Sequence, residues 1–182
     1  MSGDYAVIAA PGEDTGGIGA GAAYIFKRSG TMWSQQAKIQ SSDIAAYDSF
    51  GNSVAISGDY AFIGCRYDDD DGNGSGSVYI FKKDTGAETW TQHSKLKASD
   101  ASTNAEFGTS VSVSGDYLIS GAVRENSYTG SAYIFQRSGT AWTEVKKITA
   151  SDAAASDEFG VSVAIDGTNV IVGARAEDTK GS

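Results

Sequence analysis

Apolar residues along this chain fall in short runs that alternate with polar positions, and turns rich in Gly, Ser and Asp separate the runs. Such alternation is typical of β-strands, and no segment has the length and the 3.6-residue period of a helix. The stretch between residues 50 and 99 predicts four strands, two Gly-containing hairpin turns and one long polar loop. The predicted strands are residues 53–56, 60–65, 77–83 and 89–98, and the loop is residues 66–76.

The third and fourth predicted strands differ in how they meet solvent. Val78 and Ile80 alternate with Tyr79 and Phe81, so both faces of the third strand are apolar and we expect both to be covered. The fourth strand is more polar and carries lysines, which is typical of an outer edge strand protected against pairing with other chains. At most, a single helical turn is expected after each Ser-Asp pair of the linkers.

The whole pattern repeats. Trp stands at 33, 90 and 142, and a Phe-Gly pair follows in step at 50, 107 and 159. A period of roughly fifty residues with four antiparallel strands in each unit is typical of a β-propeller blade. The sequence therefore predicts an all-β fold made of propeller blades, with about three blades' worth of strands in the chain.

The repeated residues also resemble a known family. The segment F-G-N-S-V-A-I-S-G-D-Y-A-F-I-G at 50–64, followed by G-S-V-Y-I-F at 76–81, is similar to bacterial FG-GAP repeats, relatives of the integrin α-subunit propeller. The resemblance covers nearly the whole chain and implies an extracellular or cell-surface protein. Integrin-like calcium loops lie between the first two strands of a blade, and here that connection is only residues 57–59, so the resemblance implies no calcium at that place.

We expect one partial propeller domain over residues 1–182. Its parts are blade 1, lacking its first strand, at 4–42; blade 2 at 50–99; blade 3 at 107–151; and a partial blade 4 at 159–182.

Blades at both ends of such an array would expose apolar faces, which a soluble protein rarely tolerates. Propellers usually hold about 4–8 blades, so this chain either closes a ring with other copies or is a piece of a larger propeller. A dimer is the favoured hypothesis, because residues 161–165 of one copy would then complete the blade begun by residues 5–10 of the other.

The net charge and the single cysteine argue against several classes of function. A net charge of −9 argues against nucleic-acid and anionic-membrane partners, which require clustered Lys and Arg. No apolar run approaches the roughly 20 residues of a membrane span. Cys65 lies in a predicted strand with no second cysteine, and we expect a buried, inert thiol.

One loop carries a partial metal-binding pattern. Asp69, Asp71 and Asn73, followed by Gly74, match the start of a calcium loop, whose alternate oxygen ligands surround the ion. The match lacks the later carboxylate ligand, and the equivalent loops of the other repeats lack the pattern. The alternative is a solvated acidic loop with no cofactor at all.

Other candidate residues favour structure over chemistry. The recurrent Ser-Gly-Asp-Tyr is explained by turn geometry, and His93, the only histidine, has no motif beside it that would supply a nucleophile or a metal site. The three tryptophans fit either a glycan-stacking platform or packing of the blade edge.

No paired base and nucleophile stands out, so we expect no enzyme. The leading hypothesis is a binding and assembly module for protein partners, whose variable loops carry specificity. The alternatives are a lectin-like propeller and a calcium-binding adhesion module.

Overall fold

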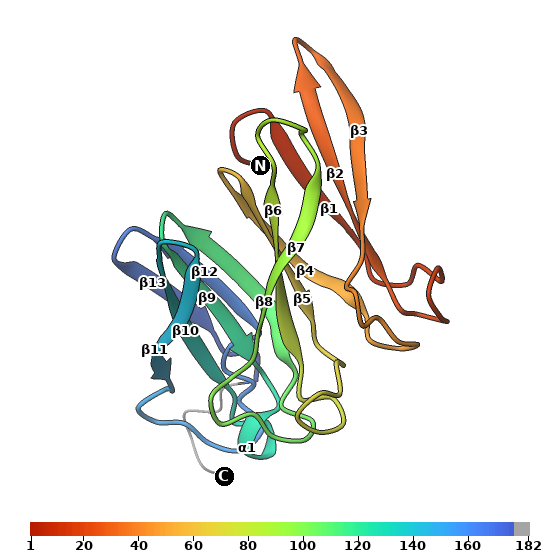
Figure 1. Cartoon of the computed structure of the whole chain (residues 1–182). Helices are drawn as coiled ribbons and strands as arrows, with labels where there is room; N and C mark the ends of the chain where they lie inside the picture. Colours follow the sequence, from red (N-terminus) through yellow and green to blue (C-terminus); the bar gives the residue numbers. More distant parts are fainter. Residues whose placement is uncertain (177–182) are drawn as a thin grey trace.

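The computed structural model describes residues 1–176 and arranges them in four antiparallel sheets that fan out side by side (Figure 1). We call the sheets blade 1 (β1–β3), blade 2 (β4–β7), blade 3 (β8–β11) and partial blade 4 (β12–β13). The strands are β1 (Tyr5–Ala10), β2 (Ala22–Ser29), β3 (Met32–Ile39), β4 (Phe50–Ser57), β5 (Tyr60–Cys65), β6 (Ser77–Lys83), β7 (Trp90–Leu96), β8 (Phe107–Ser114), β9 (Tyr117–Ala122), β10 (Ser131–Ser138), β11 (Ala141–Ile148), β12 (Ser162–Asp166) and β13 (Asn169–Gly173).

The expected all-β blade architecture is confirmed. Each four-stranded blade is a meander in chain order, β4-β5-β6-β7 and β8-β9-β10-β11, with the polar strand at its outer edge. The first strand of blade 2 is longer than predicted, because a bulge between Phe50 and Ser53 lets Phe50 pair with Cys65. Gly51 supplies the positive φ that this bulge needs.

The apolar core lies between neighbouring blades. Tyr79 and Phe81 face blade 1, while Val78 and Ile80 of the same strand face blade 3, so β6 is covered on both sides as its pattern predicted. Aromatic edge-to-face contacts stabilise the interfaces on both sides of blade 2. Tyr5 meets Trp90 between blades 1 and 2, and Phe62 meets Trp142 between blades 2 and 3.

The Phe-Gly pairs join consecutive blades at the inner strands. Phe107 forms an isolated parallel bridge with Gly76 of the preceding blade, and Phe50 and Phe159 form the equivalent bridges. The backbones approach so closely that a Cβ on Gly64 would overlap the carbonyl oxygen of Gly108. A glycine is required there because no side chain fits between the two blades.

The helical turn found among residues 1–176 lies elsewhere than expected. The element α1 (Glu125–Tyr128) is in the β9–β10 loop, not after a Ser-Asp pair, and Asn126 and Ser127 adopt left-handed backbone angles within it. The Ser-Asp segments form plain turns, since the following residues must turn directly into the next blade. Among residues 1–176 there is no helix of the length and apolarity that crossing a membrane requires.

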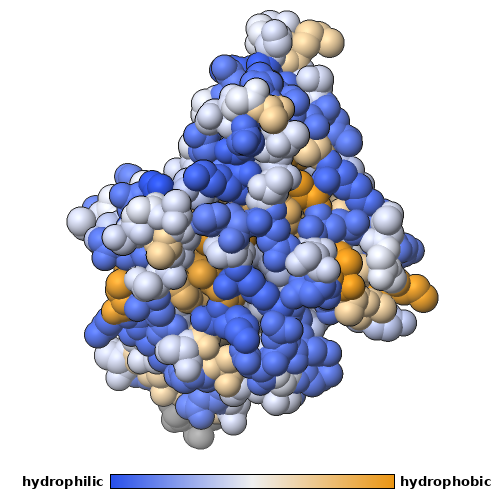
Figure 2. All heavy atoms as spheres, viewed as in Figure 1, coloured by the Kyte–Doolittle hydropathy of each residue, from blue (hydrophilic) through white to orange (hydrophobic). Residues whose placement is uncertain are grey.

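The surface in view is mostly hydrophilic, in keeping with the acidic composition (Figure 2). Hydrophobic residues show as small, separated spots among the hydrophilic ones (Figure 2).

Candidate functional site

The most elaborate polar group of the molecule surrounds the ammonium of Lys95 on β7. Its Nζ atom lies 3.0 Å from Asp43, 2.8 Å from Asp68 and 2.7 Å from Asp70. Tyr79, the cross-strand neighbour of Lys95, donates its hydroxyl to Asp68 at 2.6 Å and lies 2.9 Å from Asp43. We call these five residues the lysine cage of blade 2.

The cage fixes the charge of its members. Burial lowers the pKa of Lys95, but its hydrogen bonds to the three carboxylates outweigh that effect and raise the pKa overall. Burial tends to raise the pKa of Asp43, and the hydrogen bonds from Lys95 and Tyr79 lower it below its ordinary value. The Tyr79 pKa is raised, first by burial and then by Asp68. Near neutral pH the cage therefore holds one ammonium, ionised Asp43 and a neutral phenol.

Blade 3 repeats the cage with different residues. Lys147 contacts Asp100 at 2.6 Å and also pairs with Glu125, while Tyr133 donates to both carboxylates. The acid from the middle loop has changed from Asp to Glu, and α1 carries it inward. The geometry is thus a property of the repeat and not of one loop.

In each complete blade one arm of the cage comes from the preceding linker. Asp43 follows β3 and Asp100 follows β7, and each reaches the outer two strands of the next blade. The residue before it adds a second contact, because the Ser42 amide donates to Gln92 and the Ser99 amide donates to Glu144, both at 2.8 Å. We call this two-point contact of a Ser-Asp pair the linker clasp.

Blade 1 has only part of this arrangement. Lys38 pairs with Glu13 at 2.8 Å and donates to Thr15, and Tyr24 lies opposite Lys38 on β2. Within residues 1–176, no side-chain hydrogen bond reaches the Tyr24 hydroxyl or the Gln35 amide. Blade 1 therefore has the receiving groups of a linker clasp, and no Ser-Asp pair among residues 1–176 contacts them.

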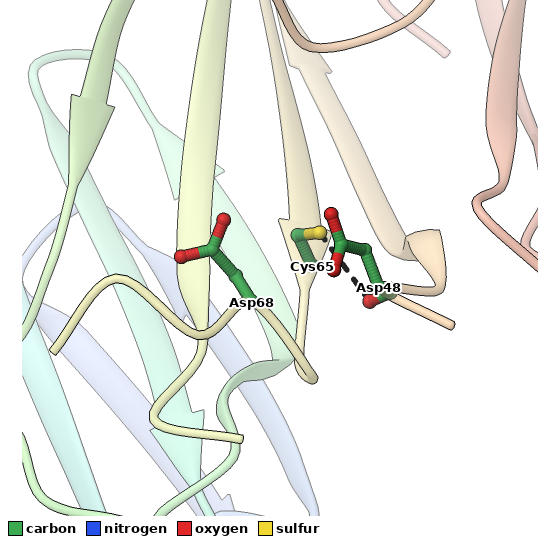
Figure 3. A group of neighbouring side chains, drawn as sticks. All are labelled: Asp48, Cys65 and Asp68. Atoms are coloured by element: carbon green, nitrogen blue, oxygen red, sulfur yellow. Dashed lines mark hydrogen bonds between the residues drawn. The ribbon is translucent and has the colours of Figure 1, made fainter. Parts of the chain in front are cut away.

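A second buried group lies beside the cage, formed by Asp48, Cys65 and Asp68 (Figure 3). Asp48 caps a turn by accepting from the Ala45 amide at 2.7 Å, and the Cys65 thiol donates to the Asp48 carbonyl at 3.3 Å. Burial raises the pKa of Asp48 to about 6, and burial likewise raises the Cys65 pKa well above its ordinary value. The thiol is accordingly protonated and unreactive.

The three residues predicted to bind calcium have different partners, and the bond at Asn73 is made by its backbone. Asp69 accepts from the Gly74 amide at 2.7 Å, Asp71 pairs with Lys97 at 2.7 Å, and the carbonyl of Asn73 accepts from the Asn104 amide at 2.7 Å. The structure brings Asp69 and Asn73 to the wall of one cavity and places Asp71 beside Lys97. Calcium binding at this loop stays a prediction.

That cavity has a volume of about 300 Å³ and lies between the loops of blades 2 and 3. Tyr47 and Tyr67 contribute aromatic surface, and Glu106 and Arg124 contribute a charged pair 2.8 Å apart. Burial raises the pKa of Glu106, which Arg124 partly offsets.

The remaining candidates fall into place as packing or surface residues. Trp90 and Trp142 are 8% and 9% exposed between blades, whereas Trp33 is 40% exposed. The half-buried His93 ring lies 2.8 Å from the Thr140 carbonyl oxygen.

Repeated four-stranded sheets joined at Phe-Gly bridges define a β-propeller repeat protein. The FG-GAP repeat family matches residues 33–81, 90–135 and 142–182, and the chain belongs to that family. No curated protein matches the chain.

The chain is similar to solved structures, of which the first below supports the fold. One is a putative 6-phosphogluconolactonase from Bacteroides fragilis, at 16% identity and a TM-score of 0.53, covering 88% of this chain and 37% of that one. Another is Sqt1 of Saccharomyces cerevisiae, at 10% identity and a TM-score of 0.43, covering 72% of this chain and 30% of that one. The chain thus spans well under half the length of these structures.

Proposed function

We propose that the chain is a non-catalytic binding and assembly module whose propeller ring is completed by a second copy. The observation that carries this proposal is the open face of blade 1. Ile8 and Trp33 are 52% and 40% exposed there, whereas their equivalents in blade 2, Ile63 and Trp90, are buried against blade 1. An exposed apolar surface whose counterpart in blade 2 is buried against a neighbouring blade calls for a partner of the same kind.

The strand edges fit the same partner. β1 is the inner edge of its sheet, in the place that β5 holds in blade 2, and among the strands of residues 1–176 it pairs with β2 alone. In blade 2 the strand β4 covers the equivalent edge, and β12 is its counterpart in partial blade 4. Strand β12 of a second copy would complete blade 1 by edge pairing, with β1 taking the place of that copy's β13.

Several features favour a role without catalysis. The carboxylates of the cages are engaged by lysines, the thiol is buried and protonated, and His93 contacts a backbone carbonyl. The likeness to the lactonase is one of fold, and fold does not carry activity. Lactone hydrolysis by the purified chain would contradict this part of the proposal.

Glycan binding is the second candidate, and the cavity between blades 2 and 3 favours it. Tyrosine faces beside Asn, Arg and carboxylate groups suit a hydroxyl-rich ligand. Titration of a sugar panel with detection by chemical shifts of the loop amides tests it. Calcium-dependent adhesion is a third reading, tested by adding calcium in the same experiment.

The assembly proposal is tested by the solution mass at several concentrations. Light scattering should give twice the 18.8 kDa chain mass at high concentration and a reversible shift toward the single chain on dilution. A monomer at every concentration would overturn it.

A further inference from the structure

We propose that Ser151-Asp152 of one copy forms the linker clasp of blade 1 in another copy, and that this contact sets the register of the assembly. The inference rests on the proposed function, because it needs a second copy at the open face of blade 1. The receiving groups are the Tyr24 hydroxyl, the Lys38 ammonium and the Gln35 side chain.

The two internal clasps supply the template. Asp43 meets Tyr79 at 2.9 Å and Lys95 at 3.0 Å, and Asp100 meets Tyr133 and Lys147 at 2.7 and 2.6 Å. Each clasp therefore joins the linker that enters a blade to the outer two strands of that same blade.

Blade 1 offers the same receiving groups in the same register. Tyr24 lies opposite Lys38 on β2 and β3, as Tyr79 lies opposite Lys95 and Tyr133 lies opposite Lys147. Gln35 lies opposite Phe26, the position that Gln92 and Glu144 hold in the later blades.

The donor pair is free at the other end of the array. Ser151 and Asp152 stand before partial blade 4 as Ser42-Asp43 and Ser99-Asp100 stand before blades 2 and 3. Asp152 is exposed, and within residues 1–176 neither it nor Ser151 makes a side-chain hydrogen bond or ion pair. The Asp152 carboxylate therefore lies at one end of the array of blades, and the Lys38 ammonium and Tyr24 phenol that could bind it lie at the other end.

The clasp also predicts a strand register. If Asp152 binds blade 1 as Asp43 binds blade 2, then β12 of one copy pairs with β1 of the other as β4 pairs with β5. In that register Ala164 of one copy lies opposite Val7 of the other. In the single chain, Ala164 faces Ile171 instead.

One local mismatch shapes the fit. Ala9 occupies the position of Gly64 and Gly121, where a Cβ would crowd Ser53 and Ser110. The equivalent Ser162 hydroxyl must turn aside when β12 docks on β1, because the Ala9 methyl takes its place. Docking is accordingly weaker than the internal contacts, and it is reversible.

A double-mutant cycle on the full chain tests the contact. Asp152→Asn and Tyr24→Phe should each weaken dimerisation, roughly 10- to 100-fold for the loss of a charge-assisted contact, and the double variant should lose little more than either single change. Thermal unfolding of the dilute monomer should be unchanged by both, since neither group has a partner there.

The matched control is Asp100→Asn with Tyr133→Phe, which breaks an internal clasp. It should lower unfolding stability and leave the dimer dissociation constant nearly unchanged. A dimer whose affinity ignores Asp152→Asn, or additive losses in the cycle, would overturn the clasp while the assembly proposal stands. A wild-type chain that never dimerises would overturn both.

Cysteine pairs read the register directly. The double variant Ala164→Cys, Val7→Cys should form a disulfide between two copies of the dimer. The double variant Ala164→Cys, Ile171→Cys should form a disulfide within one copy in the monomer, where β13 pairs with β12. Failure of the first pair to cross-link a proven dimer would overturn the register.

Discussion

The ammonium of Lys95 lies 2.8 Å from a carboxylate oxygen of Asp68, a side chain that is almost fully buried. Two further carboxylates and a phenol converge on the same pair, so one cation holds together the outer strand, the middle loop and the incoming linker of a blade. The Lys95 ammonium thus offsets part of the negative charge of three neighbouring carboxylates.

Removing that cation leaves buried negative charge without compensation. We expect Lys95→Met to lower the free energy of unfolding by about 3–5 kcal/mol, as for a broken buried ion pair. Lys38→Met, where Glu13 is the carboxylate partner, should cost about 1 kcal/mol because that pair is more exposed. Urea unfolding of both variants checks the order, and equal losses would contradict the role assigned to the cage.

The raised pKa of Asp48 predicts that the free energy of unfolding depends on pH. Burial is the largest cause that raises its pKa, to about 6, and the charges of Asp68, Asp69 and Asp43 raise it further. The hydrogen bond from the Ala45 amide acts in the opposite direction. Because the folded-state pKa exceeds the unfolded value near 4, this carboxyl favours the folded state most below about pH 4, and that contribution is lost as the pH rises to about 6.

Asp48→Asn keeps an acceptor for the Ala45 amide and removes the charge. Relative to this variant, the wild-type unfolding free energy should fall by on the order of 1–2 kcal/mol between pH 4 and pH 7. Parallel stability curves for the two proteins would show that Asp48 ionises normally.

Close backbone contact between blades predicts asymmetric effects of a methyl group. Gly64→Ala would force the blade 2–blade 3 contact apart, since its Cβ would overlap the Gly108 carbonyl oxygen, and should cost about 2 kcal/mol or more. Gly12→Ala is the matched control, because nothing lies within 4 Å of its added Cβ.

Ala9→Gly should instead tighten the dimer, and a weaker dimer would argue against docking of β12 on β1.

The tryptophans separate packing within a chain from packing between chains. Trp90→Ala should lower stability by about 3–5 kcal/mol, because this side chain is buried against Tyr5 between blades. Trp33→Ala should change monomer stability little and weaken dimerisation. Sedimentation velocity combined with thermal unfolding distinguishes these effects; a Trp33 variant that unfolds early yet dimerises normally would reverse the assignment.

Much of the architecture was accessible from the sequence because strand alternation and repeat period are local signals. The alternation at 77–83 predicted a strand covered on both faces, and the structure buries Tyr79 toward one neighbour and Ile80 toward the other. The length of β4 was missed because the Phe-Gly pair makes a bulge that alternation does not show.

The cages were missed for a different reason. Asp43 and Lys95 are 52 residues apart, so no local pattern links them. The repeats did contain a signal, because each has an acid, a tyrosine and a lysine at equivalent positions. The acids are Glu13, Asp68 and Glu125. The predicted calcium ligands Asp69, Asp71 and Asn73 belong to the same loop as the cage acids Asp68 and Asp70 but are different residues, and of the three Asp71 pairs with Lys97.

If a second copy covers the open face of blade 1, the two chains close one ring. Electron-microscopy class averages of the purified protein, at a concentration where it associates, test this closure. We expect a closed ring of blades around a central channel, with two chains in each particle. An open crescent of three blades, or chains stacked without sharing a ring, would contradict it.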